Sequence, residues 1–185
     1  MNIEPINPES LVREHIGWML ALAQRMLGDH ALAEDVVQEA FINVFRALDD
    51  FQQRASLKTW LHRITVNTAL MKLRQLKRLA EQPIDALLPE FDRYDCRLET
   101  PWNKLETVET ILADEQRRNL IHKKIHQLPD AYRIVLLLRD IEDYTTREVA
   151  DLLAISEANV KIRLHRARTA LKKLLEPLLR GEEME

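Results

Sequence analysis

The segment most informative about the architecture is residues 144–175, which read YTTREVADLLAISEANVKIRLHRARTALKKLL. Near its start, Thr145 or Thr146 is placed to cap a helix, and Glu148 stands where a capping box needs a carboxylate. The apolar and polar residues that follow predict that this helix runs to Leu153. The first part of the stretch is therefore expected to be a short, well-capped helix.

A tight turn is expected next, over residues 155–157. Ser156 is a natural N-cap for a final helix that starts near Glu157 and runs to about Glu176. Pro177 is expected to end or kink that helix, because proline lacks the backbone donor that a helix interior needs. A capped helix, a short turn and a second helix together predict a helix-turn-helix.

The final helix has a basic side. At about 100° per residue, we expect one apolar face made of Val160, Leu164, Ala167, Leu171, Leu174 and Leu175. Basic flanks are expected on either side of it: Lys161, His165, Arg168 and Lys172 on one, Arg163, Arg166 and Lys173 on the other. In a major groove such residues bond guanine edges or phosphates. The alternative is that they are solvated charges that complement the helix dipole.

The rest of the chain favours an all-α fold. Glycines number three and aromatic residues make up 5% of the 185 residues, which leaves few turn and strand formers. Gly28 is a natural helix stop and Asp29 a natural cap for the next helix. The apolar periodicity predicts further helices over residues 9–27, 31–48, 57–80, 103–127 and 131–141. We expect two small helical domains, 1–80 and 103–185, joined by an acidic linker, 81–102, that contains prolines.

Charge is unevenly distributed along the chain. The net charge is −3 and the pI about 6.1, but residues 54–80 hold seven lysines and arginines and no acidic residue. Residues 161–180 hold seven basic residues and one acidic residue, whereas 81–115 hold ten acidic residues and three basic ones. Two basic blocks separated by an acidic segment predict local contact with a polyanion.

The remaining composition suggests a reducing compartment. Cys96 is the one cysteine, so an internal disulfide is impossible. Residues 1–10 lack the basic and apolar regions of a signal peptide. No apolar run approaches the roughly 20 residues that span a bilayer. We therefore expect a cytoplasmic protein that is not itself in the membrane.

Three segments, in order, resemble the extracytoplasmic-function sigma factors of the sigma-70 superfamily. AEDVVQEAF at 33–41, continuing to Phe45, resembles the helix that binds core RNA polymerase. RASLKTWLHRITVN at 54–67 is similar to the element for the −10 promoter region, and 144–175 to the helix-turn-helix for the −35 region. The segment 52–56 reads QQRAS where many members have Arg-Gly, and Ala154 stands where glycine or another turn-former is common.

The resemblance implies roles for matching positions. Docking on the β′ clamp helices is implied for Asp35, Gln38, Glu39, Phe41 and Phe45. Contact with −10 DNA is implied for Gln52, Gln53, Arg54, Ala55, Ser56, Asn67, Arg74, Lys77 and Arg78. Contact with −35 duplex is implied for Thr146, Arg147, Lys161, His165, Arg166 and Arg168. The implied partners are core RNA polymerase (including its β subunit), promoter DNA and an anti-sigma factor. No enzymatic activity, cofactor, metal or small-molecule substrate is implied.

The sequence is also compatible with two other functions. A stand-alone helix-turn-helix repressor or activator would explain 144–175, but such proteins usually dimerise and residues 1–80 would then lack a purpose. A helical enzyme or metal sensor would need His122 and His126, which are spaced to share a metal but lack a third ligand nearby. Phe51 and Trp60, beside the loop of the first basic block, are either core residues or surfaces on which single-stranded bases stack.

Overall fold

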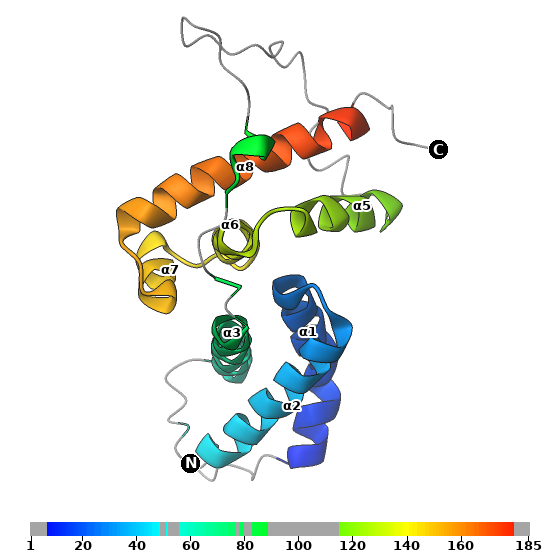
Figure 1. The fold of residues 1–185 in the computed structure, drawn as a ribbon. Coiled ribbons are helices and arrows are strands. Elements are labelled where there is room, and N and C mark those ends of the chain that lie inside the picture. Colours follow the sequence, from blue (N-terminus) through cyan, green and yellow to red (C-terminus); the bar gives the residue numbers. More distant parts are fainter. Residues whose placement is uncertain are drawn as a thin grey trace, which may run out of the picture. The chain divides into compact units, whose positions relative to one another are not determined.

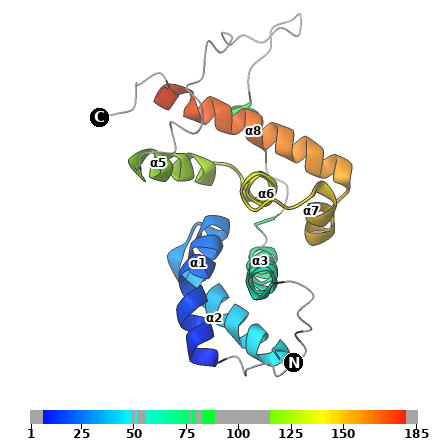
Figure 2. The same ribbon diagram turned by 180° about the vertical axis from the view of Figure 1, so that it is seen from behind.

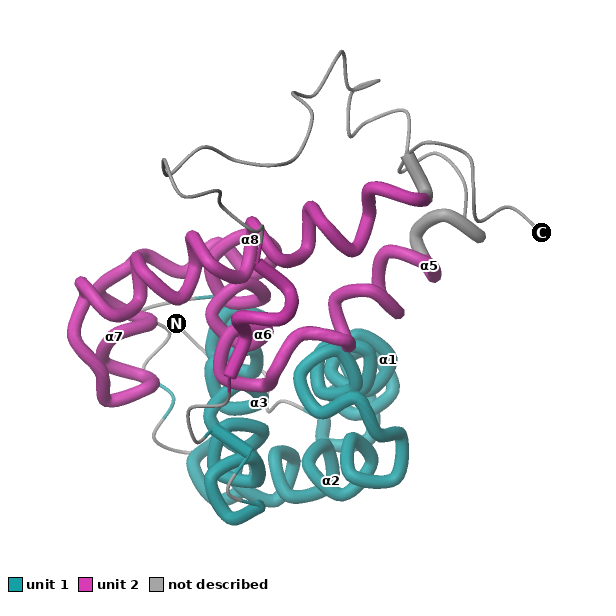
Figure 3. The backbone as a smooth tube through the Cα atoms, turned by 45° about the horizontal axis from the view of Figure 1, so that its top comes forward, with its two compact units in different colours: residues 1–79 teal, residues 80–185 magenta. Residues whose placement is uncertain are grey.

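The computed structural model describes residues 7–48, 51, 56–76, 78–79, 83–88 and 115–179. Every regular element in these ranges is helical, so the all-α prediction is confirmed (Figure 1). The chain divides into two compact units, residues 1–79 and 80–185, which Figure 3 colours separately. Each unit is described by itself below.

Unit 1 is a three-helix arrangement of α1 (Pro8–Leu27), α2 (His30–Ala47) and α3 (Leu57–Gln75), seen from two sides in Figures 1 and 2. Each helix packs against the other two. Each helix turns one apolar stripe inward. The fully buried side chains include Met19, Leu22, Met26, Leu27, Val36, Val44, Leu61, Val66, Leu70 and Leu73.

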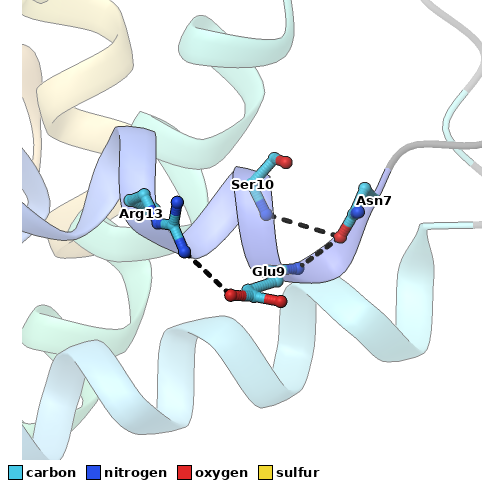
Figure 4. Close-up of polar contacts among 4 residues, drawn as sticks. All are labelled: Asn7, Glu9, Ser10 and Arg13. Atoms are coloured by element: carbon cyan, nitrogen blue, oxygen red, sulfur yellow. Dashed lines mark hydrogen bonds and ion pairs between the residues drawn. The ribbon is translucent and has the colours of Figure 1, made fainter.

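Polar caps fix where the first two helices begin and end. The Asn7 side chain accepts hydrogen bonds from the backbone of Glu9 at 2.9 Å and Ser10 at 3.5 Å (Figure 4). These bonds satisfy donors that the first turn leaves unpaired. Gly28 closes α1 with a φ of 73°, and Asp29 caps α2 by accepting from the backbone of Leu32 at 2.9 Å. Both roles agree with the sequence prediction.

Helix α3 ends earlier than expected, at Gln75 and not near residue 80. The backbone N–H of Arg78 bonds to the Leu73 carbonyl at 3.0 Å, which tightens the chain into a turn. The Arg78 guanidinium also donates to the Leu27 carbonyl at the end of α1, at 2.9 Å. The chain thus leaves the helix in a turn that the Arg78 side chain joins to the end of α1, and no glycine or proline stands at that point.

Unit 2 contains α5 (Glu115–His126), α6 (Asp130–Leu136), the π-helical turn η2 (Leu137–Ile141), α7 (Thr146–Leu153) and α8 (Glu157–Leu179). Helices α5, α6 and α7 all pack on α8. The part of the expected 103–127 helix before residue 115 lies outside the described residues. The core contains Leu128, Tyr132, Ile134, Val135, Leu137, Leu138, Val149, Val160, Ala167 and Ala170.

One continuous helix was expected over 131–141, but the structure changes to a π turn at Leu137. The backbone N–H of Glu142 bonds to the Leu137 carbonyl, five residues back, at 3.0 Å. A wider turn of this kind has no signature in a 3.6-residue apolar period. It brings Asp140 to a position that matters for α8, as described below.

Part of the expected linker packs against α8. Residues 83–88 include a short 3-10 turn, η1 (Asp85–Leu87), and the Ile84 side chain is only 2% exposed. The turn contacts α8, and the Lys173 ammonium donates to the Leu88 carbonyl at 3.0 Å. Residues 83–88, which we call the strap, thus belong to unit 2.

Helix α8 continues past the proline that was expected to end or kink it near residue 176. Pro177 lies inside the helix, which reaches Leu179. A proline this close to the end removes one backbone bond and leaves only two residues beyond it, so the last turn persists.

Candidate functional site

The helix-turn-helix of unit 2 is held by a complete capping box. The Thr145 hydroxyl accepts from the backbone of Glu148 at 3.2 Å, and the Glu148 carboxylate accepts from the backbone of Thr145 at 2.9 Å. Ser156 caps α8 by accepting from the backbone of Asn159 at 3.1 Å. Between the helices, Ala154 adopts left-handed backbone angles, φ 55° and ψ 45°. Side-chain bonds at both N-termini thus set where α7 and α8 begin.

The buried face of α8 differs from the predicted one. Val160, Arg163, Ala167 and Ala170 point inward, whereas Leu164 and Leu171 are half-buried. Arg163, which was expected on a basic flank, is only 9% exposed, so that expectation was wrong. The long aliphatic stem of an arginine can fill a core position, and a charge pattern does not reveal this.

Several predicted −35 residues are accessible. Lys161, His165 and Arg166 are exposed within two turns of α8, on the sides away from its buried face. Arg147 is exposed and Thr146 half-buried in the first turn of α7. The first half of α8 therefore presents a positive surface that has the chemistry to meet a phosphate backbone or base edges.

Arg168, the remaining predicted −35 residue, has an intramolecular partner. Its Nε and Nη2 atoms donate to the two Asp140 carboxylate oxygens at 2.8 and 2.7 Å. This hydrogen bonding raises the pKa of Arg168; partial burial acts against it, and the charge of Asp140 adds to it. The two-bond geometry is the strong form of an arginine–carboxylate pair. It joins α8 to the π turn.

Sequence reasoning passed over one exposed residue on this surface. Ile162 follows Lys161 and precedes His165 and Arg166, and its side chain is 55% exposed. An apolar residue is normally counted toward a core stripe. The available signal was its helical angle, which is well away from the inward-facing Val160 and Ala167.

In unit 1, the predicted polymerase-binding residues lie along α2. Asp35, Gln38 and Glu39 are exposed. Phe45 is 38% exposed, but Phe41 is only 7% exposed and stacks on Phe45 with ring centroids 6.1 Å apart. The surface thus combines acidic and amide groups with one accessible aromatic ring, supported from below by a buried one.

Four of the predicted −10 residues lie within the described part of the chain. Ser56 caps α3 by accepting from the backbone of Thr59 at 3.1 Å. Asn67 and Arg74 are both exposed on α3, and their spacing of seven residues puts them on one face. Arg78 is half-buried and bonded to the Leu27 carbonyl. Gln52, Gln53, Arg54, Ala55 and Lys77 lie outside the described residues.

The two aromatic residues that flank the predicted −10 loop are partly buried and pack on each other. Phe51 and Trp60 stack with ring centroids 4.7 Å apart, and both are half-buried. Phe51 comes before residues 52–55 and Trp60 lies in the first turn of α3. The stacked pair therefore joins the two ends of the loop that was predicted to meet −10 DNA.

The described residues hold neither a metal-ligand cluster nor a membrane-spanning helix. Over the part of the chain that the structure describes, no three His, Cys, Asp or Glu side chains gather as a metal would require. His122 and His126 are half-buried on α5. None of the described helices is both long and apolar enough to cross a bilayer.

Family models match both units. The model described as Sigma-70 region 2 matches residues 11–79, and the model described as Sigma-70, region 4 matches residues 118–171. The first match covers α1 to α3 and the second runs from α5 through most of α8. The two matches thus follow the order of the predicted polymerase-binding segment and the helix-turn-helix along the chain.

Whole-chain relatives agree. RNA polymerase sigma-H factor of Pseudomonas aeruginosa is 34% identical over 171 residues, which are 92% of this chain and 86% of the relative. ECF RNA polymerase sigma factor SigW of Bacillus subtilis is 33% identical over 157 residues, 85% and 82% of the two chains. ECF RNA polymerase sigma-E factor of Escherichia coli is 33% identical over 147 residues, 79% and 75% of the two chains.

Solved structures show the same fold. The sigma factor RpoE of Bartonella quintana, solved with the anti-sigma factor NepR, matches with a TM-score of 0.55 at 19% identity, covering 91% of this chain and 96% of the other. CnrH, solved with the cytosolic domain of CnrY, matches with a TM-score of 0.50 at 26% identity, covering 91% and 87%. Sigma-factor relatives of this length favour a sigma function over a stand-alone repressor. The chain belongs to the extracytoplasmic-function sigma factors of the sigma-70 family.

Proposed function

We propose that this sigma factor binds core RNA polymerase through α2, reads −35 duplex with α7 and α8, and traps melted −10 bases with α3 and its preceding loop. The observation that carries the proposal is the exposed basic surface on the first half of α8, Lys161, His165 and Arg166, in a capped helix-turn-helix. A helix seated on its own core with a cationic outer side suits insertion into a major groove.

For the −35 element, Arg166 and Lys161 supply long cationic side chains for guanine edges or phosphates. His165 adds a shorter hydrogen-bonding group between them. Thr146 and Arg147 lie at the N-terminus of α7, where backbone N–H groups and the helix dipole favour a phosphate. Arg168 supports this surface through its pair with Asp140.

For the −10 element, Asn67 and Arg74 share the exposed face of α3. We assign base capture to Asn67, because an amide can both donate to and accept from an exposed base edge. Arg74, Lys77 and Arg78 would contact the backbone, and residues 52–56 would hold an extruded base. The energy of melting comes from binding, so the chain needs no enzymatic activity, cofactor or small-molecule substrate.

For the polymerase, Phe45 is the proposed aromatic anchor on the β′ clamp helices, with Phe41 as its support and Asp35, Gln38 and Glu39 around it. Exposed aromatic side chains are typical of the residues that dominate binding at interfaces. A second contact, by unit 2 with the β subunit, would tether both DNA-reading units to one particle. Tethering raises the effective concentration of each weakly binding unit.

An anti-sigma factor is a further proposed partner. The Bartonella relative was solved with one. On this chain, exposed apolar residues such as Ile42 and Phe45 suit coverage by another protein. Purification from native cells, followed by mass spectrometry, should recover a stoichiometric inhibitor that dissociates when core polymerase binds. Recovery of the chain alone under all growth conditions would contradict this part of the proposal.

The main experiment is reconstitution with bacterial core RNA polymerase, followed by sequencing of transcripts initiated on fragmented genomic DNA. We expect start sites that share upstream −35 and −10 elements. Asn67→Ala and Arg166→Ala should abolish most of these starts, whereas Arg13→Ala, an exposed arginine of α1, should not. Failure of folded, inhibitor-free protein to bind core polymerase would overturn the proposal.

A further inference from the structure

Ile162 is a large apolar side chain on a surface that is otherwise cationic. It is 55% exposed, among the most accessible of the large hydrophobic residues in the described part of the chain. The inward-facing positions of α8 are Val160, Arg163, Ala167 and Ala170. At about 100° per residue, Ile162 lies roughly 120° from the centre of that buried face. Most of the Ile162 side chain therefore lies outside the core of unit 2.

The neighbours of Ile162 define what can approach it. Lys161, His165 and Arg166 are exposed, and Ile162 falls between His165 and Arg166 around the helix. A partner that satisfies this surface must be polyanionic and must also offer one small apolar group within reach of the helix. An acidic protein surface that carries an apolar side chain meets both conditions, and so does the major groove of DNA. The groove is favoured because α8 is the second helix of a capped helix-turn-helix.

The apolar group that the major groove offers is the C5-methyl of thymine. Every other base-edge feature there is a hydrogen-bond donor or acceptor, which an isoleucine cannot use. Burying Ile162 against a polar edge would strip water from that edge without replacing its bonds. A thymine methyl removes apolar surface from water on both sides of the contact.

We infer that Ile162 reads a thymine methyl group in the −35 element and so sets a preference for an A·T pair at one position. The inference rests on the proposed function, because it takes α8 as the −35 reader. Arg166 and Lys161 supply affinity and register, and Ile162 supplies discrimination between thymine and the bases that lack the methyl. The contact is specific to DNA, since uracil lacks this group.

The test uses sigma–core holoenzyme and a promoter recovered from the genomic transcription experiment. Each thymine of the −35 element, on either strand, is replaced in turn by 2′-deoxyuridine, which removes the methyl and leaves the pairing intact. Binding is measured for the natural chain, Ile162→Ala and Ile162→Val. Replacements in the −10 element serve as the DNA control, and Ile16→Ala, exposed on α1, serves as the protein control.

We expect one −35 thymine at which deoxyuridine weakens binding roughly four-fold, the effect of burying one methyl group. Ile162→Ala should remove that sensitivity, and Ile162→Val should keep most of it. A −35 element without thymine, equal binding of thymine and deoxyuridine, or equal sensitivity in Ile162→Ala would each overturn the inference. A holoenzyme that gives no −35 footprint would overturn the proposed function as well, which separates the two failures.

Discussion

At the residue scale, Ala154 has left-handed backbone angles in the turn between α7 and α8. This conformation is about 1 kcal/mol less favourable for a residue with a Cβ than for glycine. Ala154→Gly should therefore raise the free energy of unfolding of unit 2 by about 1 kcal/mol. Urea denaturation followed by circular dichroism would measure the change.

The matched control is Ala21→Gly, at an exposed position inside α1. There the backbone is helical, so the same replacement should lower the stability of unit 1 by about 1 kcal/mol. Opposite signs for one chemical change would show that local backbone geometry is the cause. A destabilising effect of Ala154→Gly would mean that the turn does not have these backbone angles in solution.

Arg168 and Asp140 give a second prediction at this scale. Because the guanidinium is already paired by two bonds, Arg168→Ala should change the salt dependence of −35 binding little. Arg166→Ala should reduce the slope of log affinity against log salt by about 1, as loss of one phosphate contact does. Fluorescence anisotropy of holoenzyme on labelled promoter DNA over a salt series would measure both. A slope reduced equally by both variants would mean that Arg168 leaves Asp140 to bind DNA.

At the scale of elements, α7 depends on its capping box. Thr145→Ala removes the oxygen that accepts from the Glu148 backbone and should lower the stability of unit 2 by about 1 kcal/mol. Thr145→Ser keeps the hydroxyl and should be nearly neutral. Thermal unfolding with hydrogen exchange of residues 146–153 would measure the effect. Unchanged exchange in the alanine variant would show that packing on α8, and not the cap, holds α7.

Helix positions were predictable where local signals exist. A capping residue followed by a helical apolar period predicts a helix that packs on a neighbouring core. The observed caps and stops at Gly28, Asp29, Thr145 and Ser156 lie where this rule puts them. The end of α3 was not predictable in this way. No glycine or proline marks it, and the Arg78 side chain in the turn that follows bonds to the Leu27 carbonyl, 51 residues away in sequence.

Site residues were predictable to a similar degree. The exposure of Lys161, His165 and Arg166 follows from helical angle, but the burial of Arg163 depends on how its stem packs in the core. Arg168 could not be separated from them by sequence, because its partner Asp140 is set by a π turn with no periodic signature. Ile162 was missed because it lies off the predicted apolar face and carries no charge that would mark it as a DNA contact.

For the whole molecule, the strap shows that part of the acidic, proline-containing segment packs on α8. Proline and acidic residues mark residues 81–102 as a linker, yet Ile84 is buried against unit 2. A single apolar side chain in a polar, proline-containing segment gives no period to detect. The strap therefore adds contacts to α8 that lie outside the residues matched by the region 4 model.

Loss of the Ile84 side chain should therefore affect unit 2 alone. Ile84→Ala is expected to lower its stability by about 2 kcal/mol, at the lower end for a buried aliphatic truncation because the strap is at the surface. Hydrogen exchange should rise in α8 and stay unchanged in α1, α2 and α3. Ile16→Ala, an exposed residue, is the control and should change neither unit. Faster exchange in unit 1 after Ile84→Ala would contradict this assignment of the strap.

The alanine at position 154 also has a genetic consequence. Every alanine codon begins with guanine and cytosine and every glycine codon with two guanines, so a single base change turns one into the other. The less strained turn is thus always one mutational step away from this gene. An alanine can persist at such a position when selection removes only those changes that lower stability below the threshold for function.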